Sequence, residues 1–413
     1  MSSYLPLNHH NIDHIRRQFP ALTHGEQTRL FFDGPGGSQQ PESVINAYRN
    51  FFINGNSNLG GHFATSTQTH QIVDETRKKV ATLIGASSGK EIIFGANMTS
   101  LTFSLSRAIS QDWQAGDKII LTDIDHAANR SPWVLAAKEK GVTVHYLPIQ
   151  DDRCHLDFSS FMSLLSPKTK LLALSAASNL TGTYTDLAPF IELAKANGTL
   201  TYIDAVHYLP HQQIDVTQLD ADFVAGSAYK FFGPHLGFVY GREEQLENYQ
   251  PFKVAPATNN IPNCWETGTL NFEAIAALSA TIDYLASLGT GSNLTEQITS
   301  AYRNIYQYEQ ELSQYFLATL NQFPELTLIG ETDKDKRTPT FALSFQHHDP
   351  NDIAAMLGKH HIFTWSGHLY AERLTASLNL DTKGGVLRVG MMHYNTKQEI
   401  DTFFRVLARC LKQ

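Results

Sequence analysis

Short apolar runs alternate with amphipathic segments between residues 73 and 226, and this pattern constrains the fold more than any other feature of the sequence. Strands are expected at residues 91–94, 118–122, 142–147, 171–175, 200–204 and 223–226. Helices are expected at residues 71–85, from 99 onward, and at 131–140, 158–165 and 186–196. Such alternation predicts βαβ units, and hence an α/β fold with a mostly parallel sheet flanked by helices on both faces.

The pattern changes after about residue 255. Helices are expected at residues 272–288 and 294–320, followed by strands at 340–345 and 386–389 around a helix at 351–358. We therefore expect three parts. Residues 1–30 form an arm and a short helix that join the small domain, residues 31–270 form the large domain, and residues 271–413 form an interdomain helix and a smaller α+β C-terminal domain.

Charge and cysteine content exclude several classes of function. The net charge of the 413 residues is −8, and no dense basic run is present, so nucleic-acid binding is not expected. The three cysteines, Cys154, Cys264 and Cys410, are far apart in the sequence, which favours neither a disulfide framework nor a cysteine zinc site. We expect a reducing, cytoplasmic location, no signal peptide within residues 1–10 and no membrane span.

Polar residues that follow the predicted strands are candidates for a site, because ligands of open α/β sheets bind at the carboxyl ends of strands. Asp204 ends one strand and could contact a cationic cofactor nitrogen, or only cap the next helix. Lys230 follows the next strand between Tyr229 and Phe231, which is unusual company for a solvated lysine. A lysine that holds pyridoxal phosphate (PLP) as a Schiff base, with an acid on the ring nitrogen, would explain both residues.

Two further segments follow strands. Residues 95–100 begin a helix, where free backbone N–H groups and the hydroxyls of Thr99 and Ser100 could bind a phosphate or act as an ordinary cap. His126 lies just after the strand at 118–122, where it could stack on an aromatic cofactor. The chain has 18 histidines, so His126 alone indicates little.

Seven motifs in register resemble the class V aminotransferase family within the fold-type-I PLP enzymes, most closely its cysteine desulfurase and selenocysteine lyase branch. The resemblance covers roughly residues 30 to 405. The motifs are Phe32–Ser38, Asp125–Asn129 with Pro132-Trp133, Ser178–Thr183, Asp204–His207 with Pro210-His211, Ser227–Pro234, Glu266–Asn271, and Leu387-Arg388 with Tyr394–Thr396.

The resemblance implies a role for each matched residue. Lys230 forms the Schiff base with PLP and moves protons at the substrate's α-carbon. Asp204 pairs with the pyridine nitrogen, and His126 stacks on the ring. Asn179 and His207 lie near the phenolic oxygen, and Arg388 binds the substrate carboxylate as a bidentate fork. The phosphate is held by Met98, Thr99, Ser227, Tyr229 and, from the second subunit of a homodimer, Thr269.

The departures from the family pattern concern the reaction. Desulfurases carry a cysteine on a loop, and Tyr370 stands at that position in the matching stretch Trp365–Tyr370. A persulfide requires a thiolate, which tyrosine cannot supply. In addition, Tyr229 replaces a histidine, Met98 a threonine and His207 a glutamine of the family pattern. Cys264 precedes the Glu266–Asn271 motif and is expected to be structural.

We therefore expect a PLP enzyme that acts at the α-carbon of a small amino acid, with β-elimination at a C–S bond as the favoured reaction. Transamination and epimerisation remain alternatives. A protein of another class, a PLP-fold binding or sulfur-trafficking protein without catalysis, also remains open. A nucleotide-binding Rossmann domain is not expected, because no G-x-G-x-x-G follows the early strands.

Overall fold

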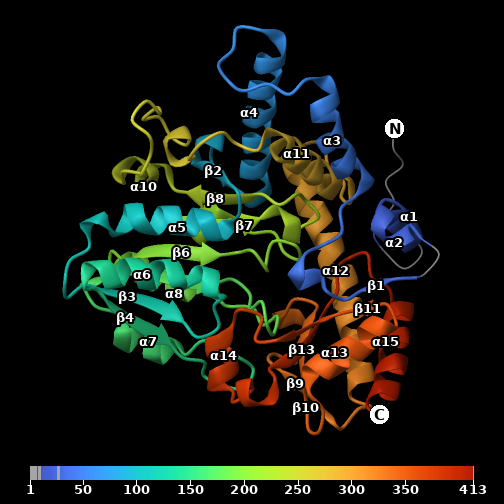
Figure 1. The fold of residues 1–413 in the computed structure, drawn as a ribbon. Coiled ribbons are helices and arrows are strands. Elements are labelled where there is room, and N and C mark those ends of the chain that lie inside the picture. Colours follow the sequence, from blue (N-terminus) through green and yellow to red (C-terminus); the bar gives the residue numbers. More distant parts are fainter. Residues whose placement is uncertain (1–6, 8–10, 26–27, 413) are drawn as a thin grey trace.

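The computed structural model describes residue 7 and residues 11–25 and 28–412 (Figure 1). Residues 1–6 and 8–10 of the predicted N-terminal arm therefore lie outside the described residues. The predicted short helix is present as α1 (Ile12–Arg17), and α2 (Pro20–Thr23) follows it. Ile12 and Ile15 of α1 are buried, so this segment packs on the body of the protein.

Seven strands form the larger sheet in the order β2-β8-β7-β6-β5-β3-β4. β8 runs antiparallel to β2 and β7, whereas all other pairs are parallel, and this confirms the predicted mostly parallel sheet. The strands are β2 (Ile92–Gly95), β3 (Lys118–Thr122), β4 (Thr143–Leu147), β5 (Thr169–Ser175), β6 (Leu200–Asp204), β7 (Phe223–Ser227) and β8 (Gly237–Gly241).

Helices cover both faces of this sheet (Figure 1), so successive residues of a central strand enter different cores. In β5, Leu171 and Ala173 belong to one apolar cluster, whereas Leu172 and Leu174 belong to the other. The helices of this part are α3 (Glu42–Asn54), α4 (Ala64–Ile84), α5 (Met98–Ile109), α6 (Ser131–Lys140), α7 (Phe158–Leu164), α8 (Leu187–Ala196), α9 (Val216–Leu219), α10 (Glu243–Asn248) and α11 (Phe272–Ser287).

A second, antiparallel sheet has the order β12-β13-β10-β9 and lies with its helices beside the first (Figure 1). Its strands are β9 (Leu326–Ile329), β10 (Thr340–Phe345), β12 (Trp365–Gly367) and β13 (Val386–Gly390), and its helices are α12 (Leu294–Leu320), α13 (Pro350–Lys359), α14 (Glu372–Ser377) and α15 (Lys397–Cys410). β1 (Leu30–Phe31) pairs in parallel with β11 (Ile362–Phe363), so the N-terminal segment joins the C-terminal part. The domain boundaries at 30 and 270 stay predictions.

Several elements were not predicted. β8 was missed because it has glycine at both ends and returns antiparallel without a crossover helix. β9 and β12 have only four and three residues. Helix α4 begins at Ala64 rather than at residue 71, because its first turns bury small polar side chains such as Ser66 and Thr69, which give no apolar period. α15 was also missed, although Thr396 and Glu399 form a capping box at its start.

Candidate active site

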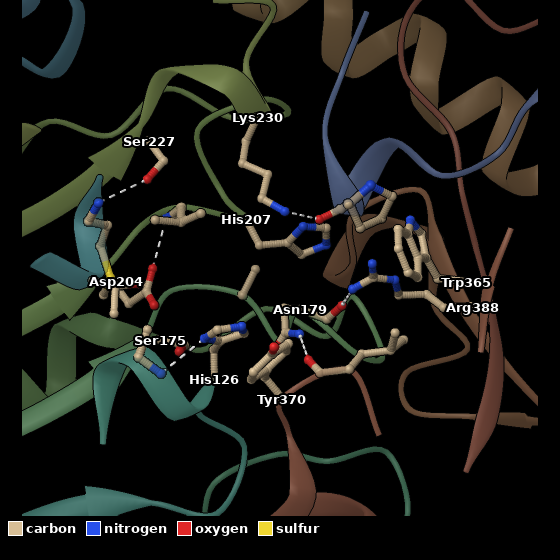
Figure 2. Close-up of a pocket in the computed structure, with 18 of the residues that line it drawn as sticks. His126, Ser175, Asn179, Asp204, His207, Ser227, Lys230, Trp365, Tyr370 and Arg388 are labelled. Atoms are coloured by element: carbon tan, nitrogen blue, oxygen red, sulfur yellow. Dashed lines mark hydrogen bonds between the residues drawn. The ribbon is translucent and has the colours of Figure 1, made fainter. Parts of the chain in front are cut away.

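The carboxyl ends of β5, β6 and β7 border a cavity of about 440 Å³, which also contacts the second sheet (Figure 2). This volume is within the range of cofactor and ligand pockets. Ten of the eleven predicted site residues line it: Met98, Thr99, His126, Asn179, Asp204, His207, Ser227, Tyr229, Lys230 and Arg388. The eleventh, Thr269, lies in a separate hollow together with Asn58.

Lys230 enters the cavity from the 3-10 turn that follows β7. Its ammonium group donates a hydrogen bond to the Pro35 carbonyl oxygen and lies 4.8 Å from the centre of the Tyr229 ring. Burial, and after it the charge of Arg388, lowers the Lys230 pKa from 10.5 to about 7. A large fraction of this amine is therefore neutral near pH 7, and the neutral amine is the form that attacks an aldehyde.

Asp204 ends β6, and its Oδ1 accepts a hydrogen bond from the Val206 backbone N–H at 2.9 Å. Burial raises the Asp204 pKa to about 7, and the neighbouring Asp125 carboxylate adds to the shift, whereas Lys230 opposes it. A cationic ligand beside Asp204 would stabilise the ionised form and reverse the shift. This carboxylate is therefore suited to a positively charged partner.

His126 caps the 3-10 turn at Ala127–Asn129 that follows β3, and its Nδ1 accepts a hydrogen bond from the Ala128 backbone N–H at 3.0 Å. Burial lowers the His126 pKa to about 4, so the ring is neutral and carries its proton on Nε2. The turn is held by Asp125, whose carboxylate accepts hydrogen bonds from the Ser175 hydroxyl at 2.6 Å and the Asn129 amide at 3.2 Å. The imidazole plane is thus fixed before any ligand binds.

The N-terminus of α5 forms one end of the cavity. The Met98 backbone N–H donates to Ser227 Oγ at 3.4 Å, and Thr99 lies beside it on the cavity wall. Gly237 in β8 permits this close approach, since a Cβ there would lie 2.3 Å from the backbone carbon of Asn97. Backbone N–H groups at a helix start, together with two hydroxyls, suit a phosphate group.

Arg388 lies at the opposite end of the cavity from Ser227, and Asn179 lies between them (Figure 2). Arg388 Nη1 donates to the Asn179 carbonyl oxygen at 2.8 Å, and Asn179 Nδ2 donates to the Leu369 carbonyl oxygen at 2.8 Å. Asn179 Oδ1 and Arg388 Nε are buried without a hydrogen-bond partner. Burial lowers the Arg388 pKa to about 10, and Asp33 opposes this shift. These unpaired polar atoms are available to a ligand.

Two of the residues that depart from the family pattern have partners of their own. His207 Nε2 lies 3.1 Å from Thr338 Oγ1, and burial lowers the His207 pKa, so its ring is neutral. Tyr229 stacks on His235 with ring centroids 4.9 Å apart, and burial raises the Tyr229 pKa. Both side chains are therefore held in place at the cavity wall without a cofactor.

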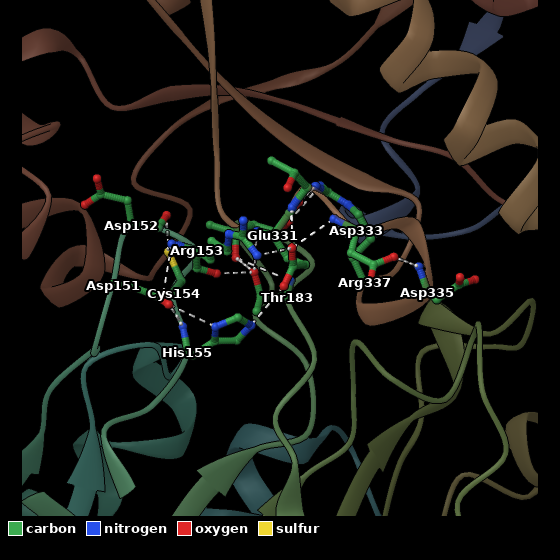
Figure 3. A network of polar contacts seen from close by, with 12 residues as sticks. Asp151, Asp152, Arg153, Cys154, His155, Thr183, Glu331, Asp333, Asp335 and Arg337 are labelled. Carbon is green, nitrogen blue, oxygen red and sulfur yellow. Dashed lines mark hydrogen bonds and ion pairs between the residues drawn. The ribbon is translucent and has the colours of Figure 1, made fainter. Parts of the chain in front are cut away.

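The turn that carries Asn179 is supported by Arg337, which comes just before β10 and which Figure 3 shows with Glu331 and Thr183. The guanidinium group of Arg337 is fully buried and donates to the carbonyl oxygens of Thr181, Thr340 and Glu331. The Glu331 carboxylate is also buried. Arg337 thus connects the Asn179 turn to β10.

Sequence reasoning assigned no site role to several residues that line the cavity: Pro35, Gly36, Ala128, Ser175, Ala177, Val206, Trp365, Ser366, Gly367, His368, Leu369 and Tyr370. The motifs at Phe32–Ser38 and Trp365–Tyr370 were recognised, and they provided the signal that could have placed the residues at 35–36 and 365–370. Tyr370 stacks on His126 with centroids 5.2 Å apart.

None of the three cysteines lines this cavity. All three are free and buried, and Cys264 lies beside another hollow, near Lys90 and Tyr249. Burial raises the Cys264 pKa, which disfavours the thiolate. Across residues 7, 11–25 and 28–412, no group of three His, Cys, Asp or Glu side chains is arranged to hold a metal ion, and no described helix has the length and apolar character needed to cross a membrane.

The chain is similar to known proteins over nearly its whole length. The sequence model of the family described as aminotransferase class-V matches residues 30–403. A cysteine desulfurase of Serratia proteamaculans is 30% identical, over 97% of this chain and 98% of that protein. An aminotransferase-like protein of Gibberella zeae is 31% identical over the same shares of the two chains.

Solved structures agree with this family in fold. A cysteine desulfurase from Escherichia coli superposes with a TM-score of 0.84 at 27% identity, covering 98% of this chain and 99% of that one. An apo cysteine desulfurase from Thermococcus onnurineus superposes with a TM-score of 0.88 at 25% identity, covering 97% and 98%. The large sheet and the smaller sheet thus form the fold-type-I arrangement. By its family match, fold and relatives, the chain belongs to the class V aminotransferase family of PLP-dependent enzymes.

Proposed function

We propose that this protein is a PLP-dependent C–S lyase that removes the β-substituent of a small amino acid. The observation that carries the proposal is the position of Tyr370, which stands where desulfurases of this family have their loop cysteine and which stacks on His126. No cysteine replaces it, because none lines the cavity. Sulfur transfer to a protein thiolate is therefore not supported, whereas direct elimination needs no such thiol.

The residues of the cavity fit PLP. Asp204 is buried, so its ionised form would be stabilised by a cationic partner such as a protonated pyridine nitrogen. The lowered pKa of Lys230 favours attack on an aldehyde. Asn179 Oδ1 is buried and lacks a partner. The start of α5 with Ser227 and Thr99 would hold the phosphate. Tyr229 and His207 would contact the cofactor from the remaining walls.

Four side chains would carry the reaction. When bound, PLP supplies an electron sink for the negative charge at the substrate's α-carbon. Arg388 binds the substrate carboxylate as a fork and so orients the α-carbon. Lys230 Nζ accepts the α-proton, and Asp204 stays ionised beside the ring nitrogen. His126 holds the ring plane by stacking, since its neutral imidazole adds no charge.

The proposed β-elimination requires neither an oxidant nor a reductant. The bond between Cα and hydrogen breaks, and the proton goes to Lys230. The Cβ–S bond breaks with its electron pair on sulfur, which leaves as a thiolate and takes a proton. Water then converts the three-carbon remainder to pyruvate and ammonium.

Transamination is the second candidate, favoured by the 31% identity to an aminotransferase-like protein of Gibberella zeae. It would leave the amino group on the cofactor and release a 2-oxo acid. Epimerisation would exchange the α-hydrogen without net product. A non-catalytic role is less well supported, because Lys230, Asp204 and Arg388 are all retained and line one cavity.

We further propose a homodimer that shares its sites. Thr269 lies outside the cavity of its own chain, as expected if it contacts the phosphate of a second subunit. The three free cysteines fit the reducing, cytoplasmic location that remains part of this proposal.

The test is a product assay on the purified, PLP-loaded protein. Cysteine, cystine, S-substituted cysteines and alanine are each supplied, and pyruvate, ammonium, sulfide or thiol, and solvent deuterium at Cα are measured. Lyase activity predicts equal amounts of pyruvate and released sulfur compound, and none from Lys230→Ala. A pyridoxamine form with a 2-oxo acid that retains its side chain would replace the lyase by an aminotransferase, and deuterium exchange without product would indicate an epimerase.

A further inference from the structure

Two aromatic rings line the cavity, Trp365 beside Arg388 and Tyr370 beside His126 (Figure 2). Trp365 in β12 pairs with Arg388 in β13, and Figure 2 shows both opposite Ser227 and Asp204. Tyr370 lines the wall beside His126, with its ring tilted by 29° to the imidazole. A substrate whose carboxylate is held by Arg388 would therefore lie in a cavity whose wall carries both rings.

The backbone holds Tyr370 against the site. Its carbonyl oxygen accepts a hydrogen bond from the Ala127 N–H at 2.7 Å, and the preceding carbonyl, of Leu369, accepts one from the Asn179 amide at 2.8 Å. Leu369 and Tyr370 have φ values of 51° and 61°, a left-handed conformation that such residues rarely adopt. Backbone strain of this kind persists where surrounding contacts enforce it, and it is concentrated at functional sites.

Neither ring serves as packing for the apolar core. Trp365 is 51% exposed and Tyr370 is 64% exposed, yet both line the cavity. Gly36 makes room for the indole, since a Cβ there would lie 2.4 Å from Trp365 Nε1. Exposed aromatic rings at the mouth of a cavity are typical of ligand contacts.

The same end of the cavity offers no charge for a charged side chain. Among the described residues that line the cavity, the charged groups are Asp204, Lys230 and Arg388. The proposed function uses all three for the cofactor, the α-proton and the carboxylate. His126 and His207 are neutral, because burial lowers their pKa. A third histidine, His368, lines the cavity beside Tyr370. Apart from these groups, the lining left for the substrate side chain is aromatic, apolar or neutral.

We propose that the substrate is a cysteine thioether whose sulfur carries an apolar or aromatic substituent, and that this substituent packs between Trp365 and Tyr370. This inference rests on the proposed C–S lyase function and narrows its substrate class. Free cysteine would leave the two rings without a partner. A substituted sulfur would fill the space that Tyr370 bounds.

A thioether would react by the same β-elimination, again without an oxidant or a reductant. Lys230 takes the α-proton, the Cβ–S bond breaks, and its electron pair leaves on the sulfur that keeps the apolar substituent. The thiolate takes a proton and departs as a thiol, and one water gives pyruvate and ammonium from the remainder.

The test compares S-benzylcysteine, S-methylcysteine, S-carboxymethylcysteine and cysteine on the PLP-loaded protein, with pyruvate as the product measured. The expected order of kcat/KM is benzyl, then methyl, with the anionic carboxymethyl compound and cysteine lowest. Binding is measured separately by calorimetry with 2-amino-5-phenylpentanoate, in which CH₂ replaces sulfur and no C–S bond can break. This readout does not depend on turnover.

Variants assign the effect to the two rings. Trp365→Ala and Tyr370→Ala are expected to weaken binding of the phenyl analogue by roughly tenfold each, while Tyr370→Phe retains it, because stacking requires the ring and not the hydroxyl. Met162→Ala is the control, since Met162 is 53% exposed on α7, away from the cavity. A thermal melt of each variant verifies folding.

The outcomes separate this inference from the function on which it rests. Equal or faster turnover of cysteine, with unchanged analogue binding in Trp365→Ala and Tyr370→Ala, would overturn the substrate class and leave the lyase intact. Tight, ring-dependent binding of the analogue with no pyruvate from any compound would overturn the lyase but keep the aromatic subsite.

Discussion

Arg337 donates a hydrogen bond from Nη2 to the carbonyl oxygen of Thr181 at 3.0 Å. This contact joins a fully buried guanidinium group, which comes just before β10, to the turn that holds Asn179 in the cavity wall. The position of the candidate site therefore depends on a polar contact between this turn and the segment that leads into β10, and not only on the carboxyl edge of the larger sheet.

Replacing Arg337 by Met is expected to lower the free energy of unfolding by about 3–5 kcal/mol, because several buried carbonyl oxygens lose their donor. Urea denaturation measures the change. Arg153→Met is the matched control: that side chain is 57% exposed and 3.8 Å from Glu331 (Figure 3), so its loss should cost less than about 1 kcal/mol. Equal costs for the two variants would refute the role of Arg337.

A buried ion pair fixes the Glu266–Asn271 motif. The Glu266 carboxylate pairs with both terminal nitrogens of Arg77, at 2.7 and 2.6 Å, and accepts the Phe94 N–H at 2.7 Å. Glu266→Gln should lower the free energy of unfolding by about 3 kcal/mol or more, because the Arg77 charge stays buried without a negative charge beside it.

The control for this change is Asp283→Asn, which removes the partner of Lys79. Asp283 is 56% exposed, so the expected loss is at most about 1 kcal/mol. Both variants are compared by chemical denaturation of the cofactor-free protein, so that PLP binding does not contribute to the measured free energy of unfolding. A loss at Glu266 no larger than that at Asp283 would show that the buried pair contributes little.

The pKa of Lys230 predicts a pH dependence for cofactor capture. The amine attacks PLP only when it is unprotonated, and its pKa is lowered to about 7. The rate of Schiff-base formation should therefore rise as the pH increases through about 7 and level off above it. Stopped-flow absorbance follows the reaction, with a free lysine derivative in parallel. A rate that keeps rising toward pH 10.5, as for the free derivative, would contradict the lowered pKa.

Asp204 is expected to require a cationic ring nitrogen as its partner. Asp204→Asn should weaken PLP binding at least about tenfold and reduce turnover more strongly, because the amide does not keep the nitrogen protonated. N-methylated PLP carries a permanent positive charge, so it should restore part of the turnover in Asp204→Asn. No rescue and no loss of affinity would argue against a contact between Asp204 and the ring nitrogen.

The fold was predictable to the extent that it depends on local periodicity. The strands at 118–122 and 200–204 and the helix at 131–140 agree residue for residue with β3, β6 and α6. β12 has only three residues, and it forms a strand because it pairs with β13, which lies about 20 residues later in the chain. Such an element leaves no periodic signal.

The candidate site was predictable where the motif itself carries the chemistry, as at Lys230 and Asp204. The Trp365–Tyr370 segment was recognised only by its missing cysteine. Its contribution depends on hydrogen bonds to Ala127 and Asn179, which lie about 190 residues or more away, and on left-handed backbone at two residues whose types do not favour it. Tertiary contacts of this kind cannot be derived from local sequence.

The most direct test of the account is covalent mapping of the cofactor. The protein is loaded with PLP, reduced with borohydride, digested and analysed by mass spectrometry. The account predicts a yellow protein before reduction and a single pyridoxyl-modified peptide that contains Lys230, absent from Lys230→Ala. Failure of the wild-type protein to bind PLP, or a label on another lysine that persists in Lys230→Ala, would contradict it.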